Sequence, residues 1–196
     1  MLPINELPAP IGPNHRRDFK DKVVAEIGCG GGWYLAEMLY QGATKAIGFE
    51  ASRTVIERAT QALQKLKLTA YEFREVDGRY LDVLPEKSVD ILLEITVFQH
   101  ISEDATKGYF RTSRRVLKNS GLFLCQFLMN DKNPLKDPYN PKEGTVYYAH
   151  KEVMELAEDH GLRVSKYGDW KWTDGKGSYW RLYVMTPNEA RASAKA

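Results

Sequence analysis

The sequence has few features that would point to a special environment. Only two of its 196 residues are cysteines, which is too few for a disulfide framework. The formal charge is +2, so the composition shows no electrostatic sign of a nucleic-acid or membrane partner. The apolar runs are only a few residues long, and we find neither a bilayer-spanning segment nor a secretory signal. These absences favour a cytoplasmic protein, expected to form a single domain over residues 1–196.

Proline is scarce along most of the chain and dense in two places. Seven of the nine prolines lie within Pro3–Pro13 and Pro134–Pro141. Because proline fixes φ and has no N–H, these stretches predict an irregular N-terminal segment over 1–20 and an irregular insert over 129–148. The alanine-rich tail over 188–196 is expected to be frayed.

Between the irregular stretches, short apolar runs alternate with helical patterns. The predicted strands cover residues 23–27, 45–49, 71–76, 89–95 and 122–128. The predicted helices cover about 35–40, 53–66 behind Ser52 as N-cap, and 103–118. This alternation is typical of an α/β fold, in which helices cover both faces of a parallel sheet. A helix near 151–158 then precedes strands at 162–167 and 178–185, which should pair antiparallel because no helix connects them.

Ligands of open α/β sheets bind at the carboxyl ends of the strands, near the point where the strand order reverses. The first predicted strand is followed by the run Glu26-Ile27-Gly28-Cys29-Gly30-Gly31-Gly32. Its glycines permit a tight turn and let a ligand approach the backbone. A dinucleotide fingerprint would need a glycine at position 33, where Trp33 stands. Taken alone, the run is also compatible with a plain strand-to-helix turn.

Acidic residues mark the ends of the next two predicted strands. Glu50 ends the second strand, where a carboxylate can accept hydrogen bonds from both hydroxyls of a ribose. Asp77 follows the third strand, where it can accept a hydrogen bond from an adenine amine. Each is an ordinary strand-end carboxylate when taken singly. With Glu26 and the glycine turn, they predict a site for a nucleoside.

Together these motifs resemble the class I S-adenosylmethionine-dependent methyltransferases over about Lys22–Met185. The glycine run is similar to that family's first motif, Val89–Ile101 to its fourth-strand motif and Arg115–Gly121 to the lead into its fifth strand. The resemblance implies a three-layer Rossmann-like sandwich, whose mostly parallel seven-stranded sheet has an antiparallel last strand. It also implies S-adenosylmethionine as cofactor. The expected cofactor-binding residues are Glu26, Gly28, Cys29, Gly30, Gly32, Glu50, Ala51, Asp77, Gly78 and Glu94.

The resemblance implies individual roles for several of these positions. Glu50 stands at the family's ribose-binding acid and Asp77 at its adenine-contacting acid. Glu94 departs from the pattern, because many members carry a small polar residue there, and we expect it to alter contacts near the methionine end of the cofactor. Cys29 and Cys125 are also expected to be small buried apolar residues.

The implied reaction is in-line transfer of a methyl group to an oxygen or nitrogen of a small-molecule acceptor. Catalysis would then consist mainly of holding the acceptor atom about 3 Å from the methyl carbon. Gln99 and His100 follow the fourth strand, and His100 is the candidate general base, with a packed residue at a helix start as the alternative. The other histidines show no metal-ligand spacing, so no metal is predicted.

Aromatic side chains are expected to wall the acceptor site. They come from the N-terminal segment through Arg17, the 129–148 insert and the 169–177 loop. The aromatic residues of the last two pieces are Tyr139, Tyr147, Tyr148, Trp170 and Trp172. Such walls suit a compact, partly apolar acceptor, although these pieces are also compatible with simple capping of the sheet edge.

Other functions remain open at this stage. An RNA or protein acceptor would use the basic stretch at Arg111, Arg114, Arg115 and Lys118, or the aromatic-basic cluster Trp170-Lys171-Trp172. The first of these is equally compatible with a solvated helix face, and the near-zero net charge disfavours a nucleic acid. A protein that binds S-adenosylmethionine or another nucleotide without methylating, or an aminopropyl transferase, is the third alternative. The oligomeric state is left open.

Overall fold

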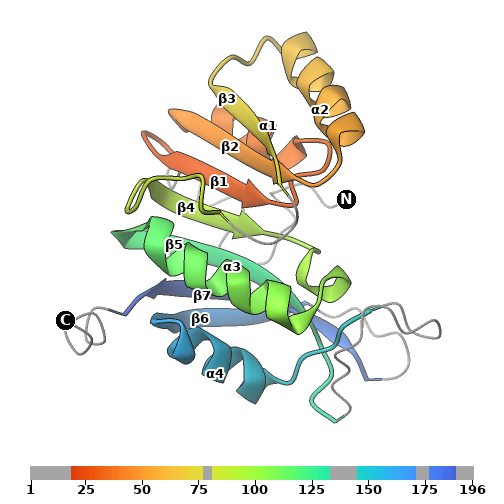
Figure 1. The fold of residues 1–196 in the computed structure, drawn as a ribbon, viewed down its shortest axis with the longest axis vertical. Coiled ribbons are helices and arrows are strands. Elements are labelled where there is room, and N and C mark those ends of the chain that lie inside the picture. The colour runs from red at the N-terminus through yellow and green to blue at the C-terminus, as the bar shows by residue number, and fades with distance from the viewer. Residues whose placement is uncertain (1–18, 77–80, 133–144, 171–176, 189–196) are drawn as a thin grey trace.

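A computed structural model describes residues 19–76, 81–132, 145–170 and 177–188. Within these residues, seven strands form one sheet in the order β3-β2-β1-β4-β5-β7-β6, which runs from top to bottom in Figure 1. The first five strands in this order, β3, β2, β1, β4 and β5, are parallel to one another. β7 runs antiparallel to its neighbours β5 and β6. The strands are β1 (Val23–Ile27), β2 (Lys45–Glu50), β3 (Tyr71–Glu75), β4 (Val89–Glu94), β5 (Leu117–Met129), β6 (Leu162–Trp170) and β7 (Tyr179–Pro187). This sheet confirms the predicted fold class.

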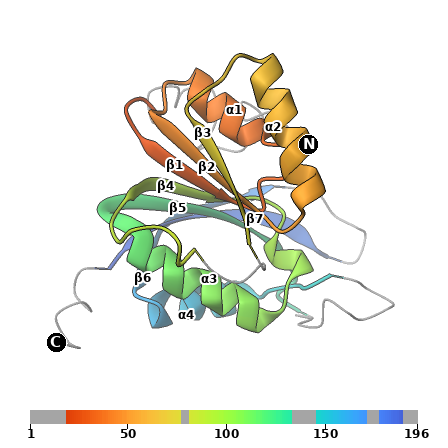
Figure 2. The same ribbon diagram turned by 45° about the horizontal axis from the view of Figure 1, so that its top comes forward.

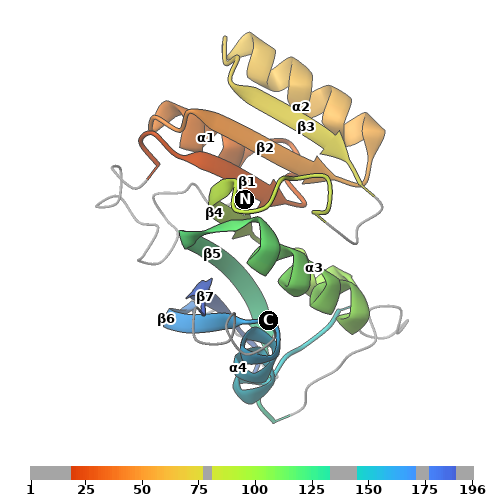
Figure 3. The same cartoon turned by 60° about the vertical axis from the view of Figure 1, so that its left-hand side comes forward.

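Helices cover both faces of the sheet. The helices are α1 (Trp33–Tyr40), α2 (Arg53–Lys65), α3 (Glu103–Val116) and α4 (His150–Asp159), with a 3₁₀ helix, η3 (Phe98–His100), after β4. Figure 2 shows α1 and α2 on one face and α3 and α4 on the other. Figure 3 shows that α2 lies along β3 at one end of the sheet and that α4 lies near β6 at the other. No helix among the described residues is long and apolar enough to cross a membrane.

The helix starts follow local chemistry. The Ser52 hydroxyl accepts a hydrogen bond from the Val55 amide at 3.4 Å, which confirms Ser52 as the N-cap of α2. Ser102 caps α3 in the same way through the Ala105 amide at 3.2 Å. Ser52 lies just beyond the carboxyl end of β2, and Ser102 follows η3 after the end of β4. These caps fix where each helix begins.

The core on the α3–α4 face holds the segment after β4 in place. Phe98, the first residue of η3, is fully buried, and its ring lies 5.0 Å from that of Phe127 and 5.8 Å from that of Phe110, centroid to centroid. Such aromatic packing adds to the gain from apolar burial. The backbone that follows β4 is therefore anchored from below by the core.

The α3–β5 junction differs from the prediction. Helix α3 ends at Val116 and β5 begins at Leu117, so Lys118 lies in the strand and the predicted helix end at 118 is wrong. The Lys118 ammonium lies 2.7 Å from the Asp90 carboxylate on β4. That cross-strand pair holds the polar start of β5 in the sheet, although residues 118–120 lack the apolar pattern of a strand.

Both described ends of the predicted insert join the sheet. Met129 ends β5 and forms a parallel bridge with Tyr148, whose amide donates to the Leu128 carbonyl at 2.9 Å. The Tyr148 ring is 2% exposed, and its hydroxyl donates to Thr106 Oγ1 at 3.1 Å. The expectation that Tyr148 walls the acceptor site is therefore wrong, because its ring belongs to the core.

The remaining pieces of the predicted acceptor wall are only partly described. Tyr147 is half-buried beside Tyr148. The segment through Arg17, Tyr139, Trp172 and the side chain of Trp170 lie outside the described residues. Their role in an acceptor wall stays a prediction.

Candidate functional site

The strand order reverses between β1 and β4, and this switch point defines the candidate site. β1 lies between β2 and β4, with Ile27 in register with Phe49 and Glu94. The carboxyl ends of these three parallel strands therefore meet at one edge of the sheet, where open α/β sheets bind their ligands. Most of the predicted cofactor-binding residues are brought together here, whereas Asp77 and Gly78 lie outside the described residues.

The glycine turn after β1 contains packed glycines, of which Gly28 is the most tightly packed, and the open Gly30. Gly28 and Gly30 both have positive φ, +63° and +49°, which side chains rarely adopt. A Cβ on Gly28 would lie 2.3 Å from Val97 Cγ2, so the segment after β4 packs directly on Gly28. A Cβ on Gly30 would meet no atom of the described residues within 4 Å. Gly30 thus offers bare backbone to open space, as a ligand-binding turn requires.

Glu50 joins the end of β2 to that turn. Its Oε2 accepts a hydrogen bond from the Gly30 amide at 3.1 Å, and its Oε1 accepts one from the Ser52 amide at 3.0 Å. The side chain is half-buried. Because a carboxylate has about four lone-pair positions, Glu50 retains capacity to accept hydrogen bonds from two further hydroxyls. The side chain is thus held in one orientation beside the open glycine.

Glu26 is a buried acid without a cation. Its side chain is 2% exposed, and its Oε2 has no hydrogen-bond partner among the described residues. Burial raises the pKa of Glu26 well above its usual value, and the nearby charges of Glu94 and Glu50 raise it further. A positively charged ligand at this edge would relieve both effects.

Glu94 links three backbone segments. Its Oε1 accepts hydrogen bonds from the Val97 amide at 2.6 Å and the Phe98 amide at 3.2 Å. Its Oε2 accepts one from the Gln126 amide on β5 at 3.0 Å. Burial raises the pKa of Glu94 to about 8, although these hydrogen bonds act to lower it. Both oxygens are engaged by backbone, so cofactor contact by Glu94 stays a prediction beside this observed bridging role.

The segment after β4 carries backbone strain. Thr96 has φ of +61°, a rare conformation for a β-branched residue and one that costs about 1–3 kcal/mol. The Glu94 hydrogen bonds and the buried Phe98 hold this conformation from its two sides. Strain of this kind clusters at functional sites, which agrees with the position of Thr96 at the carboxyl edge.

His100 lies at the end of this strained segment. Its side chain is exposed, and its amide donates to the Val97 carbonyl at 2.8 Å. The alternative of a packed His100 is wrong, because the side chain is exposed. The candidate role as a general base stays a prediction.

Two glutamines next to this segment are buried. Gln99 and Gln126 are 4% and 3% exposed, and the side-chain oxygen of each has no hydrogen-bond partner in the described part of the chain. Gln126 was missed from the sequence. Its signal is a single amide residue within the apolar run 122–128, where a buried polar group needs a reason.

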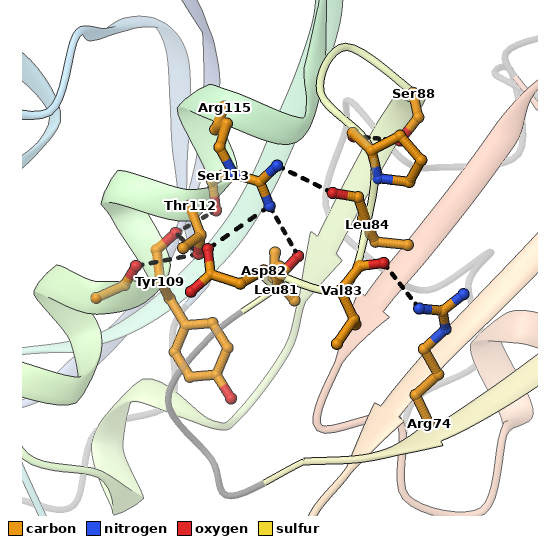
Figure 4. A network of polar contacts seen from close by, with 12 residues as sticks. Arg74, Leu81, Asp82, Val83, Leu84, Ser88, Tyr109, Thr112, Ser113 and Arg115 are labelled. Carbon is orange, nitrogen blue, oxygen red and sulfur yellow. Dashed lines mark hydrogen bonds and ion pairs between the residues drawn. The ribbon is translucent and has the colours of Figure 1, made fainter.

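Two of the four basic residues that suggested nucleic acid, Arg115 and Lys118, are engaged at the opposite edge. Figure 4 shows the Arg115 guanidinium donating to the carbonyl oxygens of Leu84, at 3.0 Å, and Leu81, at 3.3 Å. It also lies 3.6 Å from the Asp82 carboxylate. Lys118 is paired with Asp90 at the same edge. These two cations therefore serve the fold, and the predicted basic helix face does not include Lys118.

The residues at the carboxyl edge fit a cationic nucleoside ligand. The open Gly30 leaves room against the backbone, and the Glu50 oxygens are placed to accept hydroxyl donors. The Glu26 oxygen, unpartnered among the described residues, and its two neighbouring acids, Glu50 and Glu94, favour positive charge. S-adenosylmethionine carries both a ribose and a positive charge, so the carboxylates and the open glycine at this edge match it.

The comparisons with known proteins agree with this site. The profile of a family described as methyltransferase domain matches residues 24–121, which is half of the chain. The chain therefore belongs to the class I S-adenosylmethionine-dependent methyltransferases. The matched residues form an S-adenosylmethionine-dependent methyltransferase domain.

Individual relatives are more distant. An uncharacterized protein of Haemophilus influenzae is 31% identical over 91 residues, which is 45% of this chain and 36% of that protein. The alignment thus spans only about a third of that relative's length.

Solved structures share the fold. An S-adenosylmethionine-dependent methyltransferase from Mesorhizobium loti is 16% identical with a TM-score of 0.69, over 88% of this chain and 96% of that one. The 1,6-didemethyltoxoflavin-N1-methyltransferase of Burkholderia thailandensis, with its substrate and S-adenosylhomocysteine bound, is 18% identical with a TM-score of 0.73. That match covers 89% of this chain and 75% of that one.

Proposed function

We propose that the enzyme methylates an oxygen or nitrogen of a small molecule at the carboxyl edge of β1, β2 and β4. The observation that carries the position of the site is the buried, unpartnered Glu26 carboxyl oxygen close to the open Gly30. When bound, S-adenosylmethionine supplies a methyl group on a sulfonium that an acceptor lone pair can displace in line. The role of the chain is to bind both partners and to align them.

We assign the cofactor contacts by the geometry of the turn. Glu50 would accept hydrogen bonds from the ribose hydroxyls, and Gly30 would let the cofactor lie against the backbone. Glu26 would face the positive charge of the methionine end. Asp77 remains the proposed partner of the adenine amine. The other proposed contacts of the turn and strand ends are Gly28, Cys29, Gly32, Ala51, Gly78 and Glu94.

We place the acceptor beyond the end of β4. The strained Thr96 and the exposed His100 lie there, so acceptor and cofactor would meet above the Glu94 bridge. His100 is the proposed base for the proton that an O–H or N–H acceptor loses. Without a base of this kind, water would take the proton, and positioning alone would account for catalysis.

Two observations support a small acceptor over a nucleic acid. The described carboxyl edge presents three acids, Glu26, Glu50 and Glu94, and acids do not attract a phosphate backbone. Arg115 and Lys118 are engaged elsewhere. The toxoflavin N-methyltransferase with the same fold acts on a small heterocycle, according to its name.

The test is a screen for methyl transfer from labelled S-adenosylmethionine to a metabolite library, with total RNA and a protein extract assayed in parallel. We expect labelled small molecules and S-adenosylhomocysteine. Activity on a neutral acceptor should change little between 50 and 200 mM salt, whereas a nucleic acid held by several phosphates would lose orders of magnitude in affinity over a similar range. Labelling confined to RNA or protein would contradict the proposal.

A further inference from the structure

Buried acceptor oxygens without partners gather at the candidate site. Among the described residues, four buried side-chain atoms lack a hydrogen bond, and three of them belong to Glu26, Gln99 and Gln126. The fourth is Thr186 Oγ1, near the carboxyl end of β7, where Thr186 is in register with Arg163 on β6. Since native proteins pair nearly all buried polar atoms, this grouping points to a ligand that supplies hydrogen-bond donors.

Glu94 joins the two backbone segments that carry the glutamines. Its carboxylate accepts the backbone amide of Phe98, which precedes Gln99, and the backbone amide of Gln126. The segment after β4 and the end of β5 are thus joined at one point. The two glutamines with unpartnered side-chain oxygens belong to these two segments, next to the place proposed for the acceptor.

The orientation of the Gln99 amide is set by a second contact. Its Nε2 donates to the Thr96 carbonyl at 2.6 Å, so the nitrogen is used and the oxygen is left. An amide oxygen accepts hydrogen bonds and cannot donate them. The unpartnered side-chain oxygen of Gln99 therefore favours a ligand group that donates a hydrogen bond.

We propose that Gln99 and Gln126 determine acceptor specificity by accepting hydrogen bonds from N–H or O–H groups of the methyl acceptor. The assignment rests on the proposed small-molecule methyltransferase function. It predicts an acceptor with at least two hydrogen-bond donors. The glutamines take no proton in the reaction: the acceptor lone pair forms the new bond to the methyl carbon, the carbon–sulfur electrons go to sulfur, and the acceptor proton leaves to His100 or water.

The proposal predicts discrimination against acceptors without donors. A site built around buried acceptor oxygens rejects an analogue that lacks the matching N–H or O–H, because the oxygens are then left unpaired. A counterpart of the acceptor in which every N–H and O–H is methylated is such an analogue.

The test replaces Gln126 by methionine, which has a similar shape without the amide, and uses Gln61→Met on the exposed surface of α2 as the matched control. Three quantities are compared: the thermal midpoint, the affinity for S-adenosylhomocysteine, and kcat/KM for the acceptor identified in the library screen. We expect Gln126→Met to keep the midpoint and the S-adenosylhomocysteine affinity. It should lower kcat/KM about tenfold, mainly through KM, while Gln61→Met changes none of the three.

A second measurement protects the conclusion from simple misfit. With S-adenosylhomocysteine present, binding of the acceptor and of its fully methylated counterpart is measured by NMR for wild type and for Gln126→Met. Wild type should prefer the donor-bearing compound, and the variant should lose about tenfold of that preference. Equal preference in both proteins, unchanged kcat/KM, or a loss of S-adenosylhomocysteine affinity would overturn the proposal. If only RNA or protein is methylated, the proposed function fails first and the assignment fails with it.

Discussion

The two ends of strand β4 carry acids in opposite circumstances. At the amino end, Asp90 lies 2.7 Å from the Lys118 ammonium and accepts the Val23 amide at 2.9 Å, with Lys22 at 3.9 Å. At the carboxyl end, Glu94 accepts only backbone amides among the described residues and has Glu26 nearby. One acid is matched by cations, and the other is not.

The pKa values follow this difference. Burial acts to raise the pKa of Asp90, but the hydrogen bonds from Lys118 and Val23 and the lysine charges outweigh it and leave the pKa below its usual value. Burial raises the pKa of Glu94 to about 8, and that of Glu26 well above its usual value. The amino edge therefore has the electrostatics of a structural contact, and the carboxyl edge those of a site for a cation.

Replacing Glu94 and Asp90 by alanine should give the largest difference in stability between the two ends of β4. Glu94→Ala leaves three buried amide donors without an acceptor, so we expect a loss of about 3–5 kcal/mol in the free energy of unfolding. Asp90→Ala at the other end should cost only about 1–2 kcal/mol, because its lysines can turn to water. Urea unfolding measures both. Equal losses in the two variants would show that Glu94 has no special bridging role.

The two glycines should break the turn in different ways. Gly30→Val should weaken S-adenosylmethionine binding about 100-fold or more, equivalent to about 2.7 kcal/mol, because its side chain enters the open space. The positive φ should add about 1–2 kcal/mol of destabilisation. Gly28→Ala should instead act mainly on folding, since its Cβ meets Val97. Calorimetric titration and thermal melts distinguish the two, and normal cofactor binding by Gly30→Val would make the turn purely structural.

Glu50 should contribute to affinity with little effect on the fold. If it accepts charge-assisted hydrogen bonds from the ribose, Glu50→Ala should cost about 1.5–3 kcal/mol of cofactor binding free energy. Glu75→Ala is the matched control, since Glu75 lies beside Glu50 in register at the end of β3 and pairs with the exposed Arg53. Titration of S-adenosylmethionine into folded variants should separate them. Equal affinities for the two variants would remove Glu50 from the site.

The raised pKa values of Glu94 and Glu26 predict that stability and cofactor binding depend on pH. Because the pKa of Glu94 rises from 4.5 to about 8 on folding, the native state binds more protons between these values, and stability should fall as pH increases through this window. Asp90 behaves in the opposite sense, because its lowered pKa gives stability that is lost only in acid. A bound cation favours the ionised acids, so S-adenosylmethionine binding near pH 7 should release up to about one proton. Calorimetry in buffers of different ionisation enthalpy measures this release, and proton uptake would contradict the account.

The sequence was sufficient to predict the fold class and to propose a site at one edge of the sheet. Alternating apolar runs and helical spacings predicted the alternating strands and helices of an α/β protein, and Ser52 was identified as an N-cap from its type and place. The glycine run and Glu50 were proposed as site residues because ligands of open α/β sheets bind at the carboxyl ends of the strands. Local patterns suffice where local chemistry determines the structure.

The rest depended on contacts between distant residues. Lys118 enters β5 through its pair with Asp90, and Tyr148 enters the core through a bridge to Met129, neither of which leaves a local pattern. The bridging role of Glu94 depends on an amide 32 positions away at Gln126. These long-range partners cannot be deduced from spacing.

The most direct test of the site is a crystal structure of the enzyme with S-adenosylhomocysteine. The account predicts that the ribose hydroxyls lie within hydrogen-bond distance of the Glu50 carboxylate and that the ligand passes over Gly30 without displacing it. It also predicts that the amino-acid end reaches toward Glu26, with Gln99 and Gln126 left free for the acceptor. A ligand bound away from the carboxyl ends of β1 and β2, or a ribose held by other residues, would contradict it.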